Sequence, residues 1–296
     1  MLVHWSLSAV GCFPLGAYKA MVSIREELSE YGLTPRKRWG QHFLVDRNIL
    51  NKIVRTAGIT NEDVVLEVGP GLGEMTLALA QQARRVIAVE IDPKLAEILE
   101  KKVGATPNVV IVRKDILKVD FQELFKPVDH PIKVVANLPY QISTPLLFRF
   151  IESRKIFSAL TLTLQKEVAD RMVAPPGGKE YGPLSVLVQS VADISISFII
   201  KPSAFFPPPE VESAVIRLSW KERPMTAPEQ EDWFRGVVKG CLGYRRKTLA
   251  NALKHSGLPL PENLEERLEG VGIDPRRRPE TLSVREFVDL ASVLRR

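Results

Sequence analysis

Short runs rich in valine and isoleucine recur along the first two thirds of the chain, separated by stretches of helical length. Five such runs are Val64–Val68, Val86–Glu90, Val109–Arg113, Lys133–Ala136 and Ala159–Gln165. Continuous apolar runs of this length are typical of parallel strands buried on both faces. Residues Pro93–Val103, by contrast, carry apolar side chains at helical spacing, with a proline in the first turn. This alternation predicts an α/β fold with a doubly wound sheet.

Two further strands are expected at Ile194–Ile200 and Ala214–Trp220, on either side of Phe205-Phe206-Pro207-Pro208-Pro209. Three prolines cannot lie in a central strand, so this segment is predicted to be a rigid loop. Lys221–Pro228 has the composition of a linker. After it only helical patterns remain, at Glu229–Cys241, Lys247–His255, Pro261–Leu268 and Val284–Leu294. We therefore expect an α/β domain at 24–220 and a small all-helical domain at 221–296.

Residues 1–23 depart from this pattern. They are apolar and aromatic but lack the charged n-region of a signal peptide. We expect a disordered extension or an upstream start codon, with Met21 as the natural first residue. No uninterrupted apolar run reaches the ~20 residues that a membrane helix needs, so we expect a cytoplasmic protein that is not bound to a membrane.

The composition favours an anionic partner without requiring one. The formal net charge is +6 and the isoelectric point is about 9.3, values that many proteins unrelated to nucleic acids share. Cys12 and Cys241 lie far apart and match no metal-ligand spacing. Two unpaired thiols in a reducing cytosol, and no metal site, are therefore expected.

A glycine-rich turn follows the first strand. The segment Val65-Leu66-Glu67-Val68-Gly69-Pro70-Gly71-Leu72-Gly73-Glu74 predicts a strand, a turn and a helix that begins near Met75 or Thr76. Its G-x-G-x-G spacing differs from the G-x-G-x-x-G of dinucleotide sites, where a pyrophosphate lies at the helix N-terminus. Glu74 would repel an anion there. A ligand without phosphate fits better, and S-adenosylmethionine, which joins an amino acid, a sulfonium and an adenosine, is one.

Acidic residues end the next two strands. Glu90 can accept hydrogen bonds from both hydroxyls of a ribose, whereas Asp92, before Pro93, suits a helix cap. Asp115 follows the third strand and can accept a hydrogen bond from an adenine amino group. Because ligands of such sheets bind outside the carboxyl ends of the strands, these residues predict a cofactor site at that edge.

The fourth strand leads into Asn137-Leu138-Pro139-Tyr140. This segment has the groups that methylation of an aromatic amine, such as N6 of adenine, would need. The lone pair of such a nitrogen is delocalised into the ring, so hydrogen-bond acceptors must hold its N–H groups out of the ring plane before the nitrogen can attack a methyl group. The Asn137 side chain and the Leu138 main chain offer two carbonyls, Pro139 fixes the chain direction, and Tyr140 offers a ring for stacking. Positioning and desolvation, rather than a strong base, would carry the rate. A proline-ended strand with a structural tyrosine is the alternative.

Five motifs, in order along the chain, resemble those of the small-subunit ribosomal RNA adenine N6,N6-dimethyltransferases, the family linked to kasugamycin sensitivity. They are Arg36–Leu44, the glycine turn, Asn137–Tyr140, Phe206–Val211 and Tyr244–Leu249. The resemblance extends from about Ile24 to the C-terminus. It implies a Rossmann-like class I methyltransferase sheet followed by a helical RNA-binding domain.

The resemblance also implies roles for individual residues. His42 and Leu44 would line the entrance of the S-adenosylmethionine site, and the remaining contacts would come from Gly69, Gly71, Glu90, Asp115 and Asn137. The target adenine would be extruded and stacked between Tyr140 and Phe205 or Phe206, at ~1–3 kcal/mol per stacked base. The substrate would be two adjacent adenosines in a hairpin near the 3′ end of small-subunit (16S) rRNA, on the RNA or a pre-30S particle, during ribosome biogenesis. A monomer is expected.

Basic residues gather in three places. The clusters are Arg36, Lys37 and Arg38 with Arg47, Lys52 and Arg55; Arg245, Arg246 and Lys247; and Arg276, Arg277 and Arg278. Most basic clusters are solvated faces, but beside an adenine-methylating loop they favour phosphate contacts. We assign Arg36, Lys37, Arg38, Arg245, Arg246 and Lys247 to RNA binding. The alternative for Arg246 or Lys247 is a helix cap or an ion pair with glutamates.

Two other functions share part of this pattern. A large-subunit rRNA adenine N6-methyltransferase of the macrolide-resistance type would share the cofactor and catalytic motifs, but the motifs at Phe206–Val211 and Tyr244–Leu249 favour the small-subunit family. A ribosome-assembly factor that acts mainly by binding would not need Asn137–Tyr140 and Glu90 intact. The sequence leaves open how many methyl groups each adenosine receives.

Overall fold

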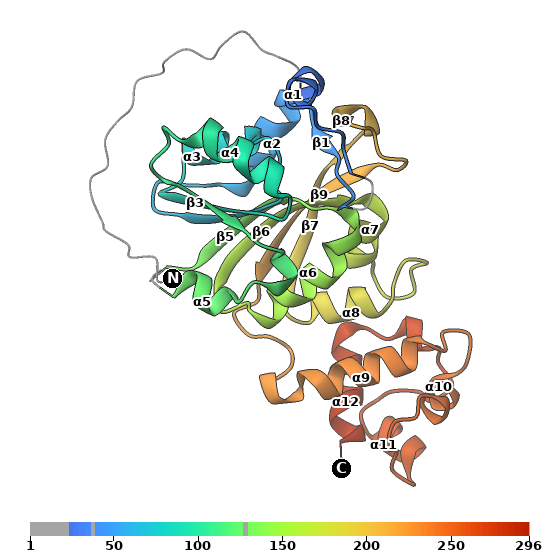
Figure 1. Cartoon of the computed structure of the whole chain (residues 1–296). Helices are drawn as coiled ribbons and strands as arrows, with labels where there is room; N and C mark the ends of the chain where they lie inside the picture. Colours follow the sequence, from blue (N-terminus) through green and yellow to red (C-terminus); the bar gives the residue numbers. More distant parts are fainter. Residues whose placement is uncertain (1–23, 37–38, 127–129, 296) are drawn as a thin grey trace. The chain divides into compact units, whose positions relative to one another are not determined.

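A computed structural model describes residues 24–36, 39–126 and 130–295 (Figure 1). The chain divides into two compact units, at Thr34/Pro35. The first contains helix α1 (Ile24–Glu30), which ends in a turn at Gly32, where φ is 59° and the Leu33 N–H donates to the Leu28 carbonyl. The expectations for residues 1–23, Lys37 and Arg38 lie outside the described residues.

The second unit contains a seven-stranded sheet of order β4-β3-β2-β5-β6-β9-β7. Its strands are β2 (Val64–Val68), β3 (Arg85–Glu90), β4 (Val109–Arg113), β5 (Ile132–Asn137), β6 (Phe157–Gln165), β7 (Ala192–Ile200) and β9 (Ser213–Trp220). Strands β2 to β6 are parallel, and β9 runs antiparallel between β6 and β7. The seven predicted strands are confirmed to within two residues at each end, and the sheet is mixed.

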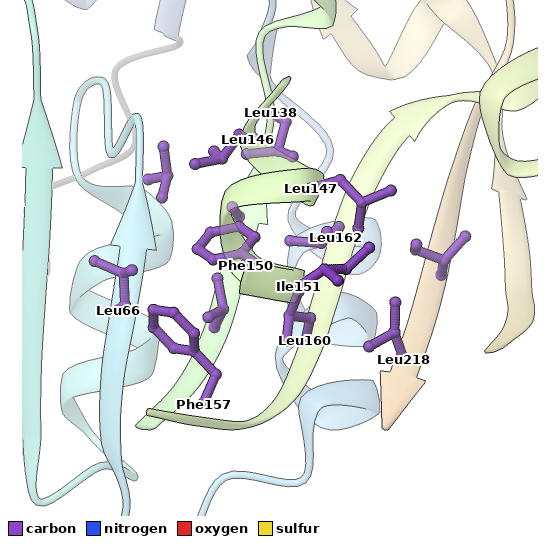
Figure 2. Close-up of a cluster of buried hydrophobic side chains, with 14 of the residues drawn as sticks. Leu66, Leu138, Leu146, Leu147, Phe150, Ile151, Phe157, Leu160, Leu162 and Leu218 are labelled. Atoms are coloured by element: carbon purple, nitrogen blue, oxygen red, sulfur yellow. The ribbon is translucent and has the colours of Figure 1, made fainter. Parts of the chain in front are cut away.

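Helices cover both faces of this sheet because its strands bury side chains on both faces. Alternate residues such as Val65, Val135 and Val215 share a hydrophobic cluster with α2 and α3, whereas Leu66, Leu160 and Leu218 point to the opposite face. There they pack against α6, as Figure 2 shows around Phe150. The helices of this unit up to β7 are α2 (Arg47–Ala57), α3 (Glu74–Ala80), α4 (Pro93–Val103), α5 (Phe121–Phe125), α6 (Tyr140–Glu152), α7 (Lys166–Val173) and α8 (Pro183–Gln189).

The chain after β9 is helical, as predicted. It forms α9 (Glu231–Leu242), α10 (Leu249–His255), α11 (Leu264–Gly270) and α12 (Val284–Leu294). Their apolar faces form one hydrophobic cluster that also takes in Tyr181, Val186 and Leu187 from the segment around α8. The Tyr181 hydroxyl donates to the Leu282 carbonyl at 2.8 Å, so this segment is anchored to the helical region. A domain boundary near residue 221 stays a prediction.

A two-stranded ribbon was not expected. Strand β1 (Phe43–Leu44) pairs antiparallel with β8 (Phe205–Phe206), with Phe43 opposite Phe206. The predicted loop at Phe205–Pro209 is therefore wrong for its two phenylalanines, which form a short strand before the prolines. None of the helices in the described ranges combines the length and the apolar character that a bilayer crossing needs.

Candidate functional site

The glycine turn lies at the carboxyl edge of the sheet, between β2 and α3. Gly71 has φ of 57°, and a Cβ added to it would lie 3.0 Å from Cε1 of Phe43. Gly73 has φ of 84°, and a Cβ there would lie 2.3 Å from Leu99 Cδ1 in α4. Only glycine satisfies both the backbone conformation and this close packing. Phe43, which lies over the turn, is a site residue that we did not single out from the sequence.

Glu90 ends β3 beside this turn. Its Oε2 accepts a hydrogen bond from the Gly71 N–H at 3.2 Å, and its Oε1 accepts one from the Asp92 N–H at 2.8 Å. The side chain is buried, and burial raises its pKa to about 7 despite these two donors. Each carboxylate oxygen has a second lone pair. Glu90 is thus fixed by the backbone and keeps two acceptor positions for a ligand.

A second carboxyl group, Glu67, lies inside β2 and is completely buried. Burial raises its pKa to about 8, and the neighbouring Glu90 adds to the rise. The Thr76 hydroxyl offsets part of it, although that hydroxyl and both carboxyl oxygens lack a hydrogen-bond partner of ordinary geometry among the described residues. The available signal in the sequence was an ionisable residue inside an apolar strand motif.

Asp115 lies at the end of the neighbouring strand. The Lys114 N–H donates to the Glu90 carbonyl at 3.1 Å, which joins the ends of β3 and β4. Asp115 is half-buried, and its Oδ1 accepts the Leu117 N–H at 3.0 Å as an N-terminal cap. Its other oxygen is available to a donor. Asp92 caps α4 by accepting the Lys94 N–H at 3.0 Å, as predicted.

Glu74 does not act as the anion-repelling group that we expected at the start of α3. Its carboxylate forms ion pairs with Lys102 at 2.8 Å and with Arg47 at 3.3 Å. These two cations compensate its charge, so Glu74 itself gives little reason to exclude a phosphate. The carboxyl group that lies directly against the turn is instead that of Glu90, which accepts the Gly71 N–H.

Asn137 ends β5 and is tied to the ribbon. Its Nδ2 donates to the main-chain carbonyl of His42 at 3.0 Å. This contact determines which end of the amide is engaged, because a carbonyl can only accept. The Leu138 side chain is buried, and its N–H donates to the Thr163 carbonyl at 3.0 Å. Both carbonyl oxygens that we expected to face a substrate amine therefore belong to residues held by neighbouring segments.

Tyr140 begins α6 directly after Pro139. Its ring is stacked against the His42 ring, with the centroids 5.5 Å apart and the planes at 29°. Its hydroxyl lies 2.7 Å from Ser213 Oγ. The His42 Nδ1 lies 2.7 Å from the Pro207 carbonyl and must be the donor, which leaves Nε2 unprotonated in the neutral ring. Ser213 and Pro207 are two more positions that we had not named as site residues.

The glycine turn and the Asn137–Tyr140 segment lie next to each other. A Cβ added to Gly69 would lie 3.9 Å from Pro139 Cδ, and Phe43, which covers Gly71, follows His42. Leu44 packs against the hydrophobic cluster of α2 and α3. Phe205 is 4% exposed and lies in that same cluster, whereas Phe206 is half-buried. Of the two phenylalanines, Phe206 is thus the more accessible.

The predicted RNA-binding residues have different environments. Arg36 lies 3.8 Å from Asp92 and has its guanidinium over the Trp39 ring. Arg245 donates to Glu280 at 2.9 Å and to the Lys179 carbonyl, so it holds the segment before α8 against the helical region. Arg246 and Lys247 are exposed, with Lys247 Nζ 3.4 Å from His255 Nε2. The exposed pair fits a phosphate-binding role better than Arg245 does.

Comparison with known proteins assigns the chain to one family. Residues 32–295 match the family model described as ribosomal RNA adenine dimethylase. The chain belongs to this family. Its match covers the glycine turn, the Asn137–Tyr140 segment and the helical region in one continuous stretch, as the sequence motifs predicted.

Individual members of the rRNA adenine dimethylase family and related structures are also similar. The ribosomal RNA small subunit methyltransferase A of Geobacter metallireducens is 46% identical over 265 residues, which cover 89% of this chain and 96% of that protein. A dimethyladenosine transferase from Plasmodium falciparum has a TM-score of 0.74 and 28% identity, over 84% of this chain and 96% of that one. The 23S rRNA methyltransferase ErmE has a TM-score of 0.67 and 25% identity, over 86% and 100%. The predicted class I methyltransferase fold with a C-terminal helical region is confirmed.

Proposed function

We propose that this dimethylase transfers methyl groups from S-adenosylmethionine to N6 of two adjacent adenosines in a hairpin near the 3′ end of small-subunit rRNA. The single observation that carries the proposal is the close approach of Gly69 to Pro139, where a Cβ added to Gly69 would lie 3.9 Å from Pro139 Cδ. It puts a turn suited to the cofactor beside two carbonyls and an aromatic ring suited to the target base. The reaction would take place in the cytoplasm, on rRNA or a pre-30S particle, with the protein as a monomer.

The residues at the carboxyl edge fit S-adenosylmethionine. Glu90 keeps acceptor positions for the ribose hydroxyls, and the free oxygen of Asp115 suits the adenine amino group. Gly69 and Gly71 allow close approach of the methionine part, and the ribbon residues His42 and Leu44 border the same turn. The carboxyl group of Glu90, when ionised, would suit a ligand with positive charge. The bound cofactor supplies an electrophilic methyl group on its sulfonium.

Asn137 and Leu138 would hold the target amine. Because Nδ2 of Asn137 is engaged by His42, its Oδ1 is the end left for one N–H of adenine N6. The carbonyl of Leu138 would accept the other, and Pro139 directs the chain between them. Holding both N–H groups out of the ring plane localises the nitrogen lone pair. The reaction then depends on orientation within a desolvated site, which can contribute several kcal/mol.

Tyr140 and Phe206 would enclose the base. Tyr140 is already fixed at its ring and at its hydroxyl, and Phe206 lies on β8, paired with Phe43. Phe205 is assigned to the core of the α/β part instead. Arg246 and Lys247 would contact RNA phosphates. Arg245 and Arg36 are less suited to this role because each is paired with a carboxylate, Glu280 and Asp92 respectively.

The small-subunit substrate is favoured over a large-subunit one by the degree of similarity. The small-subunit enzyme of Geobacter metallireducens is 46% identical to this chain, whereas the 23S enzyme ErmE is 25% identical. The retained Glu90 and Asn137 argue against a factor that acts by binding alone. Mass mapping of rRNA after incubation with isotopically labelled cofactor tests the proposal. We expect label on two adjacent adenosines of immature small subunits, and label only on naked large-subunit RNA would contradict it.

A further inference from the structure

The hydroxyl of Tyr140 is paired inside the protein. It lies 2.7 Å from the Oγ of Ser213, a side chain with no exposed surface. Ser213 is the first residue of β9, where it is paired with Gln165 of β6 and Ile200 of β7. Its backbone position is therefore set by strands on both sides. The described residues offer no second hydrogen bond to the Ser213 side chain, so its hydroxyl serves Tyr140 alone.

The rest of the tyrosine is held from other directions. Its backbone follows Pro139 at the start of α6, and its ring is stacked on His42. His42 is itself fixed by the Pro207 and Asn137 contacts. Stacking against His42 permits the ring to slide and tilt, whereas a hydrogen bond at the far end of the ring fixes its direction. Ser213 supplies that last constraint.

We propose that Ser213 is a positioning residue for methyl transfer, whose hydroxyl sets the orientation of the Tyr140 ring on which the target adenine stacks. The inference rests on the proposed function and adds a residue to it. It also assigns the phenol a purely structural task, because a hydroxyl bonded to a buried serine is not presented to the substrate. Burial raises the pKa of Tyr140, which keeps the phenol neutral.

A double-mutant cycle tests this assignment. Ser213→Ala and Tyr140→Phe each remove one hydroxyl and keep the remaining side chain. Each should lower kcat for rRNA methylation by roughly three- to tenfold, the effect of one net hydrogen bond. The double variant should lose no more than either single variant, because the two hydroxyls act only together. The affinity for S-adenosylhomocysteine and the KM for RNA should change little.

Ser190→Ala is the matched control. Ser190 is also buried, its hydroxyl donates to the Leu187 carbonyl at 2.8 Å, and it lies near the opposite end of β9, just before the Ala192–Trp220 pair. It should lower stability without lowering kcat. Should Ser213→Ala fail to fold, Ser213→Cys keeps the volume with a poor hydrogen-bonding group.

Two outcomes would overturn the inference. One is wild-type kcat in the folded Ser213 variants. The other is a further loss in the double variant equal to that of Ser213→Ala alone, which would mean that Ser213 acts independently of Tyr140. A wild-type protein that methylates no small-subunit rRNA would instead refute the proposed function, so the two failures are distinguishable.

Discussion

Asn137 Nδ2 donates a hydrogen bond to the main-chain carbonyl oxygen of His42, with 3.0 Å between the two atoms. This contact joins the end of a central strand to the two-stranded ribbon that covers the glycine turn. It also leaves the carbonyl end of the amide for a substrate. The amide is thus oriented before any base arrives, which reduces the reorganisation that the reaction requires.

Substitution of Asn137 should abolish most of the activity. Asn137→Ala removes the acceptor and the tether, and Asn137→Asp cannot donate to the His42 carbonyl. By analogy with the loss of other preorganised hydrogen-bonding groups, we expect kcat to fall by about 10²- to 10³-fold. Asn108→Ala is the control, because Asn108 also donates to main-chain carbonyls, of Ala80 and Ala83, at the other end of the strands. Single-turnover methylation that is equally slow in both variants would contradict the assignment.

Glu67 should make the stability of the protein depend on pH. Its pKa of about 8 in the folded state lies above the ordinary value of 4.5, so the folded state retains a proton that the unfolded chain releases. The free energy of unfolding must then decrease as pH rises from about 4.5 through 8. The decrease should be on the order of a few kcal/mol. Glu90, with its pKa also raised, contributes in the same direction.

Glu67→Gln should remove this part of the pH dependence. Urea unfolding at about pH 5 and about pH 9 measures it, since the midpoint shifts with stability. We expect the wild type to lose more stability than the variant over that interval. Equal losses would show that Glu67 is ionised in the folded protein, or that it is solvated.

Alanine substitutions of the two phenylalanines of β8 should have different effects, one mainly on stability and the other mainly on methylation. Phe205→Ala creates a cavity in the core and should destabilise the fold by about 3–5 kcal/mol. Phe206→Ala should change stability less and should reduce methylation by the loss of a stacking contact, about 1–3 kcal/mol. Thermal unfolding and kcat/KM for rRNA measure the two effects. The reverse pattern would place Phe205, and not Phe206, against the base.

Alanine substitutions of Arg246 and Arg245 should also have different effects, the first on RNA binding and the second on local structure. Arg246→Ala should weaken RNA binding and reduce the slope of log K against log salt concentration by about 1, as expected for one phosphate contact. Arg245→Ala should mainly loosen the segment around Lys179 and Glu280. Filter binding over a range of salt concentrations checks both. A normal salt slope for Arg246→Ala would remove it from the RNA-binding surface.

The strands and the acidic residues that end them were predictable because they depend on local pattern. Buried parallel strands are recognisable as short runs rich in valine and isoleucine. An aspartate directly before a proline indicates the start of a helix, and Asp92 caps α4 in this way. The proximity of Gly71 and Glu90 was predictable because the carboxyl ends of parallel strands lie at one edge of the sheet.

The remaining parts of the site depend on contacts between distant residues. The ribbon strands are two residues long and have no periodicity, so nothing in the sequence indicated that Phe43 pairs with Phe206. The pairing of Tyr140 with Ser213 spans 73 residues. Glu74 forms ion pairs with cations on α2 and α4, and this compensation removes the anion-repelling role that its position in the sequence indicates.

The central claim is that Glu90 holds the cofactor at the carboxyl edge of the sheet, while a separate basic surface that contains Arg246 and Lys247 holds the RNA. Glu90→Ala tests it most directly, with methyl transfer and binding to immature small subunits measured on the same preparation. We predict that methyl transfer and S-adenosylhomocysteine binding are lost while the affinity for the subunit stays at the wild-type value. Loss of subunit binding to the same degree, in a variant that still folds, would contradict the separation of the two surfaces.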